Sequence, residues 1–267
     1  MARRVSAMRV ALGLEYHGAG FCGWQTQPSG CGIQDHLQRA LSRIADHPVE
    51  TVCAGRTDRG VHALAQVVHF DTSAERPLSA WVRGVNSCLP TGVAVNWART
   101  VGPQFHARYG ARERCYHYLL LNRPEPPGVY QGRVGWCSRP LDIKAMRQAA
   151  GLLLGVRDFS AFRAAECQAR TPVRELRQLE MAQHGSLVVF RFVADAFLHH
   201  MVRNMVGCLV WVGTGKRPPG WAGELLEGRE RSQGGPTFGS EGLYLSRVRY
   251  AAEWELPEPE LSPVFLC

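Results

Sequence analysis

The densest group of reactive side chains in the sequence lies in residues 53–62, which read Cys-Ala-Gly-Arg-Thr-Asp-Arg-Gly-Val-His. Asp58 stands there between Arg56 and Arg59, and glycines on both sides allow a ligand to approach the backbone closely. Nearby positive charge lowers the pKa of a carboxyl group, so we expect Asp58 to stay ionised. An ionised carboxylate is a usable nucleophile. The alternative interpretation is a surface turn in which Asp58 only pairs with arginine.

Two predicted strands, at 49–54 and 64–70, hold this loop between them. A further strand is predicted at 8–16. Apolar residues at helical spacing predict an amphipathic helix over 33–46.

The second half of the chain predicts a similar mixture of elements. Asp142 is a helix N-cap for an apolar face that runs to Leu153. A hairpin is expected from 176–181 and 187–195, followed by an apolar helix over 197–212 and a final strand at 244–250.

Strands and helices do not alternate strictly, which predicts an α+β fold with a mixed, mainly antiparallel sheet. The pattern breaks at Gly102-Pro103. We therefore expect an N-terminal domain over 1–104 that carries the Asp58 loop, and a C-terminal domain over 105–267.

The 267 residues include 31 basic and 23 acidic side chains, a formal charge of +8. Only Lys144 and Lys216 are lysines, so arginine supplies nearly all the positive charge. Arginine pairs bidentately with phosphate, which favours a nucleic acid partner, although a GC-rich genome would also favour arginine. The apolar runs are far shorter than a membrane span requires. No signal peptide is apparent, so we expect a cytoplasmic protein.

Nine scattered cysteines contain no C-x-x-C pair. We expect free thiols in a reducing compartment, most of them filling the core. A zinc site would need clustered ligands, and the only adjacent histidines, His199 and His200, diverge on a helix, so no metal is expected.

Residues 55–62 closely resemble the G-R-T-D-x-G-V-H signature of the tRNA pseudouridine synthase A family. Arg59 departs from the small residue common at that position, so no family role is carried over to it. Further blocks are similar to the family in order and spacing, and they extend from about residue 9 to 250: Gly23-Trp-Gln25 with Ile33-Gln34, Gln66–Phe70, Phe105–Arg108, Arg170–Pro172, Phe197–Asn204 and Glu241–Leu245.

The resemblance implies a pseudouridine synthase fold, with two α+β halves around the sheet and a central catalytic cleft. It implies isomerisation of uridine to pseudouridine at positions 38, 39 and 40 of the tRNA anticodon stem-loop, without cofactor or metal. The partners implied are tRNA and a second copy of the chain in a homodimer. The sequence leaves open whether Asp58 attacks the sugar C1′, adds to the base C6 or abstracts a proton.

The resemblance also assigns residues to roles. Asp58 would be catalytic, Tyr116 would stack on the flipped uracil, Arg203 would pair with Asp58, and Leu243 and Leu245 would form an apolar wall. Arg56 would fill the space that the flipped base leaves. The expected tRNA contacts are Arg76, Phe105, His106, Ala107, Arg108, Tyr109, Glu166, Cys167, Gln168, Ala169 and Arg170.

Each of these residues also has a purely structural interpretation. Tyr116 lies in an alternating strand, where most tyrosines belong to the core. Arg203 lies on an apolar helix, where an arginine is costly without a partner. Two rival functions remain: a non-catalytic tRNA-binding protein on the same scaffold, and a hydrolase that uses Asp58 with a second carboxylate or a metal.

Overall fold

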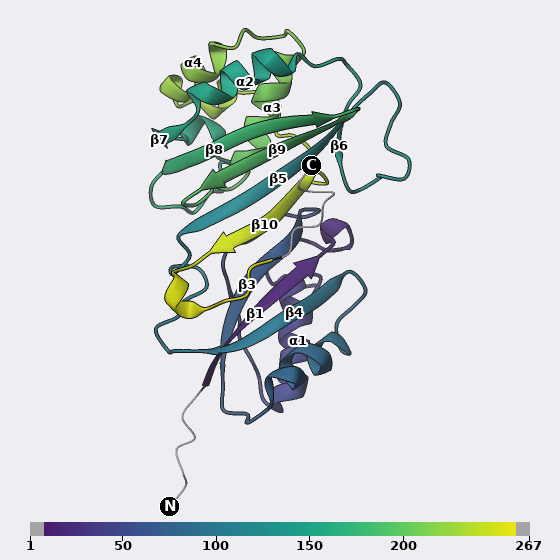
Figure 1. The fold of residues 1–267 in the computed structure, drawn as a ribbon, viewed down its shortest axis with the longest axis vertical. Helices are drawn as coiled ribbons and strands as arrows, with labels where there is room; N and C mark the ends of the chain where they lie inside the picture. Colours follow the sequence, from purple (N-terminus) through teal and green to yellow (C-terminus); the bar gives the residue numbers. More distant parts are fainter. Residues whose placement is uncertain (1–7, 260–267) are drawn as a thin grey trace, which may run out of the picture. The chain divides into compact units, whose positions relative to one another are not determined.

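The computed structural model describes residues 8–259 (Figure 1). The chain divides into two compact units. Unit 1 contains the chain up to Arg112 and the segment that begins at Leu245, and unit 2 is Glu113–Tyr244. The boundary therefore lies eight residues later than the one predicted, and the C-terminal segment is part of unit 1.

The return of the chain to unit 1 has a packing reason. The Tyr250 hydroxyl donates to the carbonyl of Ala107 at 2.7 Å. The ring of Trp254 meets Phe105 edge-on, with 5.2 Å between ring centroids. Sequence spacing cannot reveal such long-range contacts, so the division at 104/105 separated segments that share one core.

Unit 1 is built on an antiparallel sheet in the order β4-β1-β3, with β2 paired to β3 and β10 beside β3. Its elements are β1 (Met8–Tyr16), α1 (Ile33–Ala45), β2 (Val52–Cys53), β3 (His62–Thr72), β4 (Val93–Val101) and most of β10 (Leu243–Arg249). The predicted strand at 49–54 is thus reduced to two paired residues.

Helix α1 confirms the predicted helix to within one residue at its end. Ile33, Leu37 and Leu41 lie along one face and are fully buried. The Asp35 carboxylate accepts from the backbone N–H of Gly32 at 2.9 Å, which satisfies a donor at the start of the helix.

Unit 2 contains an antiparallel sheet in the order β5-β9-β8-β7, with the short β6 parallel to β5. Helices α2, α3 and α4 gather beside this sheet (Figure 1). The elements are β5 (Glu113–Asn122), β6 (Gly135–Cys137), α2 (Ile143–Leu152), β7 (Gly155–Asp158), β8 (Val173–His184), β9 (Leu187–Ala194), α3 (Met201–Gly213) and α4 (Trp221–Gly228).

Both predicted helices of unit 2 are present. In α2 the Asp142 side chain accepts from the N–H of Ala145 at 3.0 Å, as expected of an N-cap. The apolar helix α3 begins at Met201, four residues later than predicted, because His200 has the left-handed backbone angle φ 61°. A left-handed residue cannot continue a right-handed helix.

The residues described contain ten strands and a few helices; the strand pairing is mostly antiparallel, and the β5–β6 pair is parallel. This confirms the predicted α+β class with a mixed, mainly antiparallel sheet. Among residues 8–259, no helix is both long enough and apolar enough to span a bilayer.

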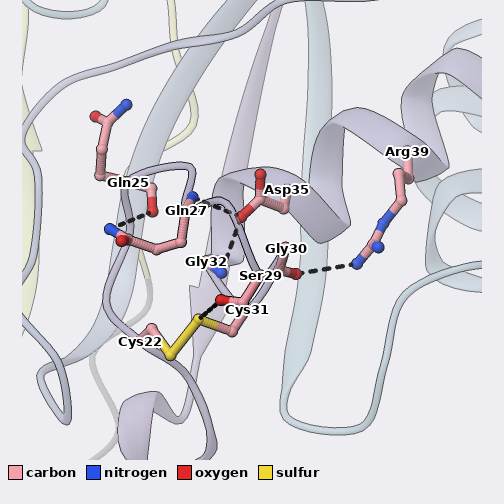
Figure 2. Close-up of a disulfide and its surroundings, with 9 residues drawn as sticks. All are labelled: Cys22, Gln25, Gln27, Ser29, Gly30, Cys31, Gly32, Asp35 and Arg39. Carbon is pink, nitrogen blue, oxygen red and sulfur yellow. Dashed lines mark hydrogen bonds between the residues drawn. A yellow bond between two sulfur atoms is a disulfide. The ribbon is translucent and has the colours of Figure 1, made fainter.

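The expectation that all cysteines are free thiols is wrong. Cys22 and Cys31 form a disulfide that closes the loop before α1 (Figure 2). Their Cα atoms are 5.5 Å apart, within the range that a disulfide requires. The free thiols among the described residues are those of Cys53, Cys88, Cys115, Cys137, Cys167 and Cys208, and Cys267 lies outside that range. Four of the six are buried, as core-filling cysteines should be.

Candidate active site

The Asp58 loop connects β2 to β3 in unit 1. Asp58 is half-buried, whereas Arg56 and Arg59 on either side of it are exposed. The N–H of Val61 donates to the carbonyl of Asp58 at 3.1 Å, which closes a turn through Gly60. The carboxylate is therefore carried on a short, hydrogen-bonded turn and flanked by positive charge.

A second segment, Gly23–Trp24, lies directly against this loop. The Trp24 N–H donates to the carbonyl of Thr57 at 2.9 Å. Gly23 has φ +91°, and a Cβ built on it would lie 2.9 Å from the Thr57 carbonyl oxygen. Only glycine permits both this backbone angle and this approach. The sequence block containing Gly23 and Trp24 therefore braces the residue before Asp58.

Arg56 and Arg108 are both close enough to the thiol of Cys53 to affect its ionisation. Burial raises the pKa of Cys53 to about 12, and the two guanidiniums oppose that rise. Both arginines are exposed. The structure thus brings the predicted base-flipping arginine and one predicted tRNA contact to the same part of unit 1.

The segment 105–109 is only partly at the surface. Phe105 and Ala107 are wholly buried in a core cluster with Ala11 and Val67. Their side chains offer no surface to RNA, which corrects the expectation that the whole segment makes contacts. Tyr109, by contrast, is 78% exposed, and Arg108 lies 5.6 Å from the centre of its ring.

Histidines support the exposed part of this segment. Nδ1 of His106 accepts from the N–H groups of Arg108 and Tyr109, and Nδ1 of His69 accepts from the N–H of Ala107 at 3.1 Å. Burial, with a contribution from the Arg9 charge, lowers the pKa of His69 to about 4. A neutral His69 is what an acceptor requires, so its protonation opposes this arrangement.

The remaining predicted tRNA contacts lie elsewhere in the two units. Arg76 is exposed in unit 1, and its Nε donates to the carbonyl of Ile44 at 3.1 Å. In unit 2 the segment 166–170 forms a surface loop in which Glu166, Gln168 and Arg170 are exposed, while Cys167 and Ala169 are half-buried.

Tyr116 lies in β5 of unit 2 and is 8% exposed. Its ring packs edge-on against Phe197, with 5.0 Å between centroids. Tyr118, two residues on, is wholly buried, and its hydroxyl donates to the carbonyl of Gly239 at 2.9 Å. Burial raises the pKa of Tyr118 well above its usual value. The Tyr118 side chain is therefore part of the core, whereas the Tyr116 side chain has a small exposed area.

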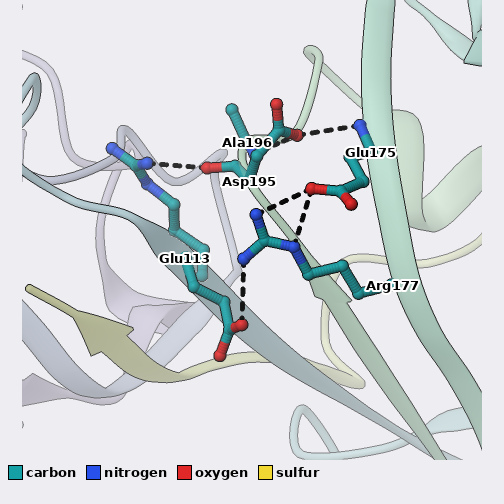
Figure 3. Close-up of polar contacts among 6 residues, drawn as sticks. Glu113, Glu175, Arg177, Asp195 and Ala196 are labelled. Atoms are coloured by element: carbon teal, nitrogen blue, oxygen red, sulfur yellow. Dashed lines mark hydrogen bonds and ion pairs between the residues drawn. The ribbon is translucent and has the colours of Figure 1, made fainter. Parts of the chain in front are cut away.

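A polar network fixes the start of β5, a few residues before Tyr116 (Figure 3). Arg177 of β8 bridges Glu175, at 2.7 Å, and Glu113 of β5, at 3.2 Å. Arg114 donates to the backbone carbonyl of Asp195 at 2.8 Å, and the Asp195 carboxylate accepts from the N–H of Glu175. These bonds tie β5, β8 and β9 together at the end of β5 nearest Tyr116.

Arg203 has a hydrogen-bond partner within unit 2. A partner was expected because an arginine on an apolar helix is costly without one. Its Nε donates to the carbonyl of Phe238 at 2.8 Å, and the N–H of Phe238 donates back to the carbonyl of Arg203 at 3.2 Å. A Cβ at Gly207 would lie 1.9 Å from the carbonyl oxygen of Pro236, so glycine allows the loop 234–240 to press against α3.

The neighbour of Arg203 strengthens this link. The buried Asn204 donates to the carbonyl of Phe162 at 2.7 Å and accepts from the Thr237 hydroxyl at 2.7 Å. Arg231 donates to the same Asn204 oxygen at 3.0 Å. Sequence reasoning included Asn204 in a motif and gave it no role, because its partners are 27 to 42 positions away.

Leu243 and Leu245 lie two residues apart on β10 and are both buried. Alternate residues of a strand face the same side of the sheet. The two leucines therefore share one face, as a common apolar wall requires. Tyr244 and Ser246, on the opposite face of the strand, are buried as well.

Comparison with known proteins places the chain in a class of RNA-modifying enzymes. Residues 13–110 and 149–251 match the family model described as tRNA pseudouridine synthase. Three proteins named tRNA pseudouridine synthase A are similar over nearly their whole length. The protein of Thiobacillus denitrificans is 58% identical over 94% of this chain and 96% of its own. The protein of Methylobacillus flagellatus is 56% identical over 95% of this chain and 97% of its own. The protein of Dechloromonas aromatica is 56% identical over 94% of this chain and 96% of its own.

The chain belongs to the tRNA pseudouridine synthase family, whose members are isomerases that convert uridine to pseudouridine in tRNA. This confirms the resemblance inferred from the motifs. A solved structure of an unknown protein from Galdieria sulphuraria, covering 71% of this chain and 81% of its own, has 12% identity and a TM-score of 0.21, too low to bear on the assignment.

Proposed function

We propose that this protein isomerises uridine to pseudouridine at positions 38, 39 and 40 of the tRNA anticodon stem-loop, with Asp58 as the nucleophile. The observation that carries this proposal is the half-buried Asp58 on a braced turn, flanked by two exposed arginines, in a chain of this family. A reacting group needs to be held in place before the substrate arrives, and this turn supplies that.

The reaction balances without any added reagent. The bond from C1′ to N1 of the uracil breaks, and a bond from C1′ to C5 forms. The hydrogen on C5 leaves as a proton, and N1 gains one. No electrons are gained or lost overall, so the proposal requires no cofactor and no metal.

A uridine within a stem must first leave the helix, which costs a few kcal/mol of pairing and stacking. Arg56 is exposed two residues before Asp58, and we assign it to the space that the base leaves. Tyr116 would then stack on the extruded uracil, and Leu243 and Leu245 would exclude water from it. Arg203 would direct its remaining donors to Asp58, its Nε being bonded to Phe238.

Several exposed residues are suited to hold the RNA. Arg76, Arg108 and Arg170 offer positive charge, and Tyr109 offers a largely exposed ring for base stacking. Glu166, Cys167, Gln168 and Ala169 complete the second surface segment, and His106 supports the first. Phe105 and Ala107 act from the core, by anchoring the segment.

We also propose a cytoplasmic homodimer. The reaction requires tRNA, which is present in the cytoplasm, and the family resemblance supports the dimer. Sedimentation of the purified protein, alone and with tRNA, tests whether it is a homodimer. A monomer at all concentrations would contradict it.

The test uses tRNA transcripts with a single [5-³H]uridine at position 38, 39 or 40. The proposed reaction removes the C5 hydrogen, so each transcript should release tritium in proportion to pseudouridine formed. A matched transcript with its only labelled uridine at position 33, in the loop, should release none. Binding of every transcript without release from any would instead favour a non-catalytic tRNA-binding protein.

A further inference from the structure

Three buried polar side chains are hydrogen-bonded to one another in and beside the Asp58 loop. Tyr16, Thr57 and Gln66 are 4%, 6% and 0% exposed. The hydroxyls of Tyr16 and Thr57 are 2.8 Å apart. The side-chain amide of Gln66 lies 3.3 Å from the Tyr16 hydroxyl and 2.7 Å from the carbonyl of Gly55. These residues come from β1, the loop and β3, and all belong to unit 1.

The hydrogen-bonding capacity of the Gln66 amide fixes the direction of the bonds that it makes. The Gln66 Oε1 accepts from the N–H of Val67 at 3.2 Å, which orients its NH₂ group toward Gly55 and Tyr16. The amide nitrogen can only donate, so the Tyr16 oxygen accepts from it. The Tyr16 and Thr57 hydroxyls are hydrogen-bonded to each other, and either one can be the donor. One amide therefore holds residue 55 directly and residue 57 through Tyr16.

Thr57 is also held through its main chain. Its carbonyl accepts from the N–H of Trp24 at 2.9 Å, on the side where Gly23 permits close packing. Beyond it, the carbonyl of Asp58 accepts from Val61. The residue before Asp58 is thus fixed by both its side chain and its backbone, and Asp58 itself is fixed by its carbonyl.

We propose that Thr57, with Tyr16 and Gln66 behind it, is a positioning residue for the Asp58 carboxylate. This inference rests on the proposed role of Asp58 as the nucleophile. A displacement of about 1 Å at a reacting group can cost about 100-fold in rate. The network would therefore act on the chemical step, not on the affinity for tRNA.

A merely structural role makes a different prediction. Buried hydrogen bonds stabilise the fold wherever they are, so their loss would lower stability without changing the rate of folded protein. Thr72 provides the matched control. It is equally buried in unit 1, and its hydroxyl bonds to His47 at 2.8 Å and to the N–H of Ala74 at 3.0 Å, at the opposite end of β3 from the loop.

The experiment measures single-turnover tritium release with protein in excess over tRNA, and tRNA affinity by filter binding. Thr57→Val keeps the shape and removes the hydroxyl, and Thr57→Ser keeps the hydroxyl. We expect Thr57→Val and Tyr16→Phe to slow release by about 10- to 100-fold with tRNA affinity retained. Thr57→Ser should recover most of the rate, and Thr72→Val should lose stability but no rate.

Combining Tyr16→Phe with Thr57→Val adds a further readout. Residues that act as one unit are not additive, so the double variant should be no slower than the slower single variant. A wild-type rate in Thr57→Val and Tyr16→Phe, or an equal loss in Thr72→Val, overturns the inference while the proposed function stands. Absence of release by the unmodified protein overturns the proposed function, and the inference with it.

Discussion

The backbone N–H of Trp24 donates to the carbonyl of Thr57 at 2.9 Å, which joins the loop before α1 to the residue preceding Asp58. The same loop is closed by the Cys22–Cys31 disulfide. The loop that carries Asp58, the proposed nucleophile, is therefore supported by a second loop that a disulfide closes. Substitutions in that second loop should therefore alter the position of Asp58.

Replacing Gly23 by alanine tests this support directly. The added Cβ would meet the Thr57 carbonyl at 2.9 Å in a backbone conformation that side chains rarely adopt. We expect a loss of about 1–3 kcal/mol in the free energy of unfolding, together with slower tritium release. Urea denaturation and single-turnover kinetics measure the two effects.

Gly30→Ala is the matched control. Gly30 also has a positive φ of +69°, but its nearest neighbour would be the end of the Arg39 side chain at 3.5 Å. The Gly30→Ala variant should lose stability through backbone strain and keep the wild-type rate of tritium release. If both variants have the same rate, the approach of Gly23 to the Asp58 loop has no catalytic consequence.

Reduction of the disulfide should destabilise the protein. The cross-link closes a loop of nine residues' separation, and the chain entropy it removes from the unfolded state corresponds to about 2–3 kcal/mol. The free energy of unfolding of Cys31→Ser should be lower than that of the oxidised wild type by this amount, so the variant should unfold at a lower urea concentration. Dithiothreitol should lower the wild type to the same midpoint and leave Cys31→Ser unchanged.

Cys88→Ser serves as the control, because Cys88 is a half-buried free thiol in unit 1. It should retain the full response to dithiothreitol. A wild-type midpoint that does not respond to reduction would show that the disulfide contributes no stability.

His69 should make stability depend on pH. Its pKa is lowered from the usual 6.5 to about 4 in the folded protein, mainly by burial. The unfolded chain therefore binds the proton more readily between these values, and stability rises with pH there. The contribution of neutral His69 to the free energy of unfolding is complete above pH 6.5 and is lost as the pH falls toward 4. Urea midpoints measured across this range should show the loss.

His69→Asn should reduce the slope of stability against pH in that window, since asparagine keeps an acceptor and does not titrate. Equal slopes in wild type and His69→Asn would exclude His69 as the titrating group.

The exposed pair Arg108 and Tyr109 should contribute differently to tRNA binding. Arg108→Ala should reduce the dependence of log affinity on log salt by about 0.7–0.9, one phosphate contact. Tyr109→Ala should weaken binding by about 1–3 kcal/mol, through loss of stacking, with little change in salt dependence. Filter binding at several salt concentrations measures both.

Arg157, exposed on the short strand β7, is the comparison for Arg108. Its replacement by alanine should leave the salt dependence as it is in the wild type. A similar reduction in both variants would mean that Arg108 acts only through the net charge of the protein.

Much of the fold could be predicted from local pattern. The period of Ile33, Leu37 and Leu41 predicted α1 because a helix buries one face, and the α+β class followed from the order of the elements. Strand β7 and helix α4 were missed. β7 has no buried alternation, as Val156 is 63% exposed, and α4 is only eight residues long.

The candidate site was predicted less completely. Motifs identified Asp58, Tyr116 and Arg203, but not what holds them, since the partners of Thr57 and Asn204 are distant in sequence. The pairing of Cys22 with Cys31 depends on the loop bringing two chain segments together, which spacing alone does not show. Phe105 looked like an RNA-stacking residue because the sequence does not reveal that Tyr250 and Trp254 return to cover it.

Tritium release from a [5-³H]uridine transcript labelled at position 39, by wild type and by Asp58→Asn, tests the central claim most directly. Asparagine keeps the size of the side chain and removes its charge and nucleophilicity. We predict release by the wild type and none by Asp58→Asn, with tRNA binding retained in both. Equal release by the two proteins would contradict the account.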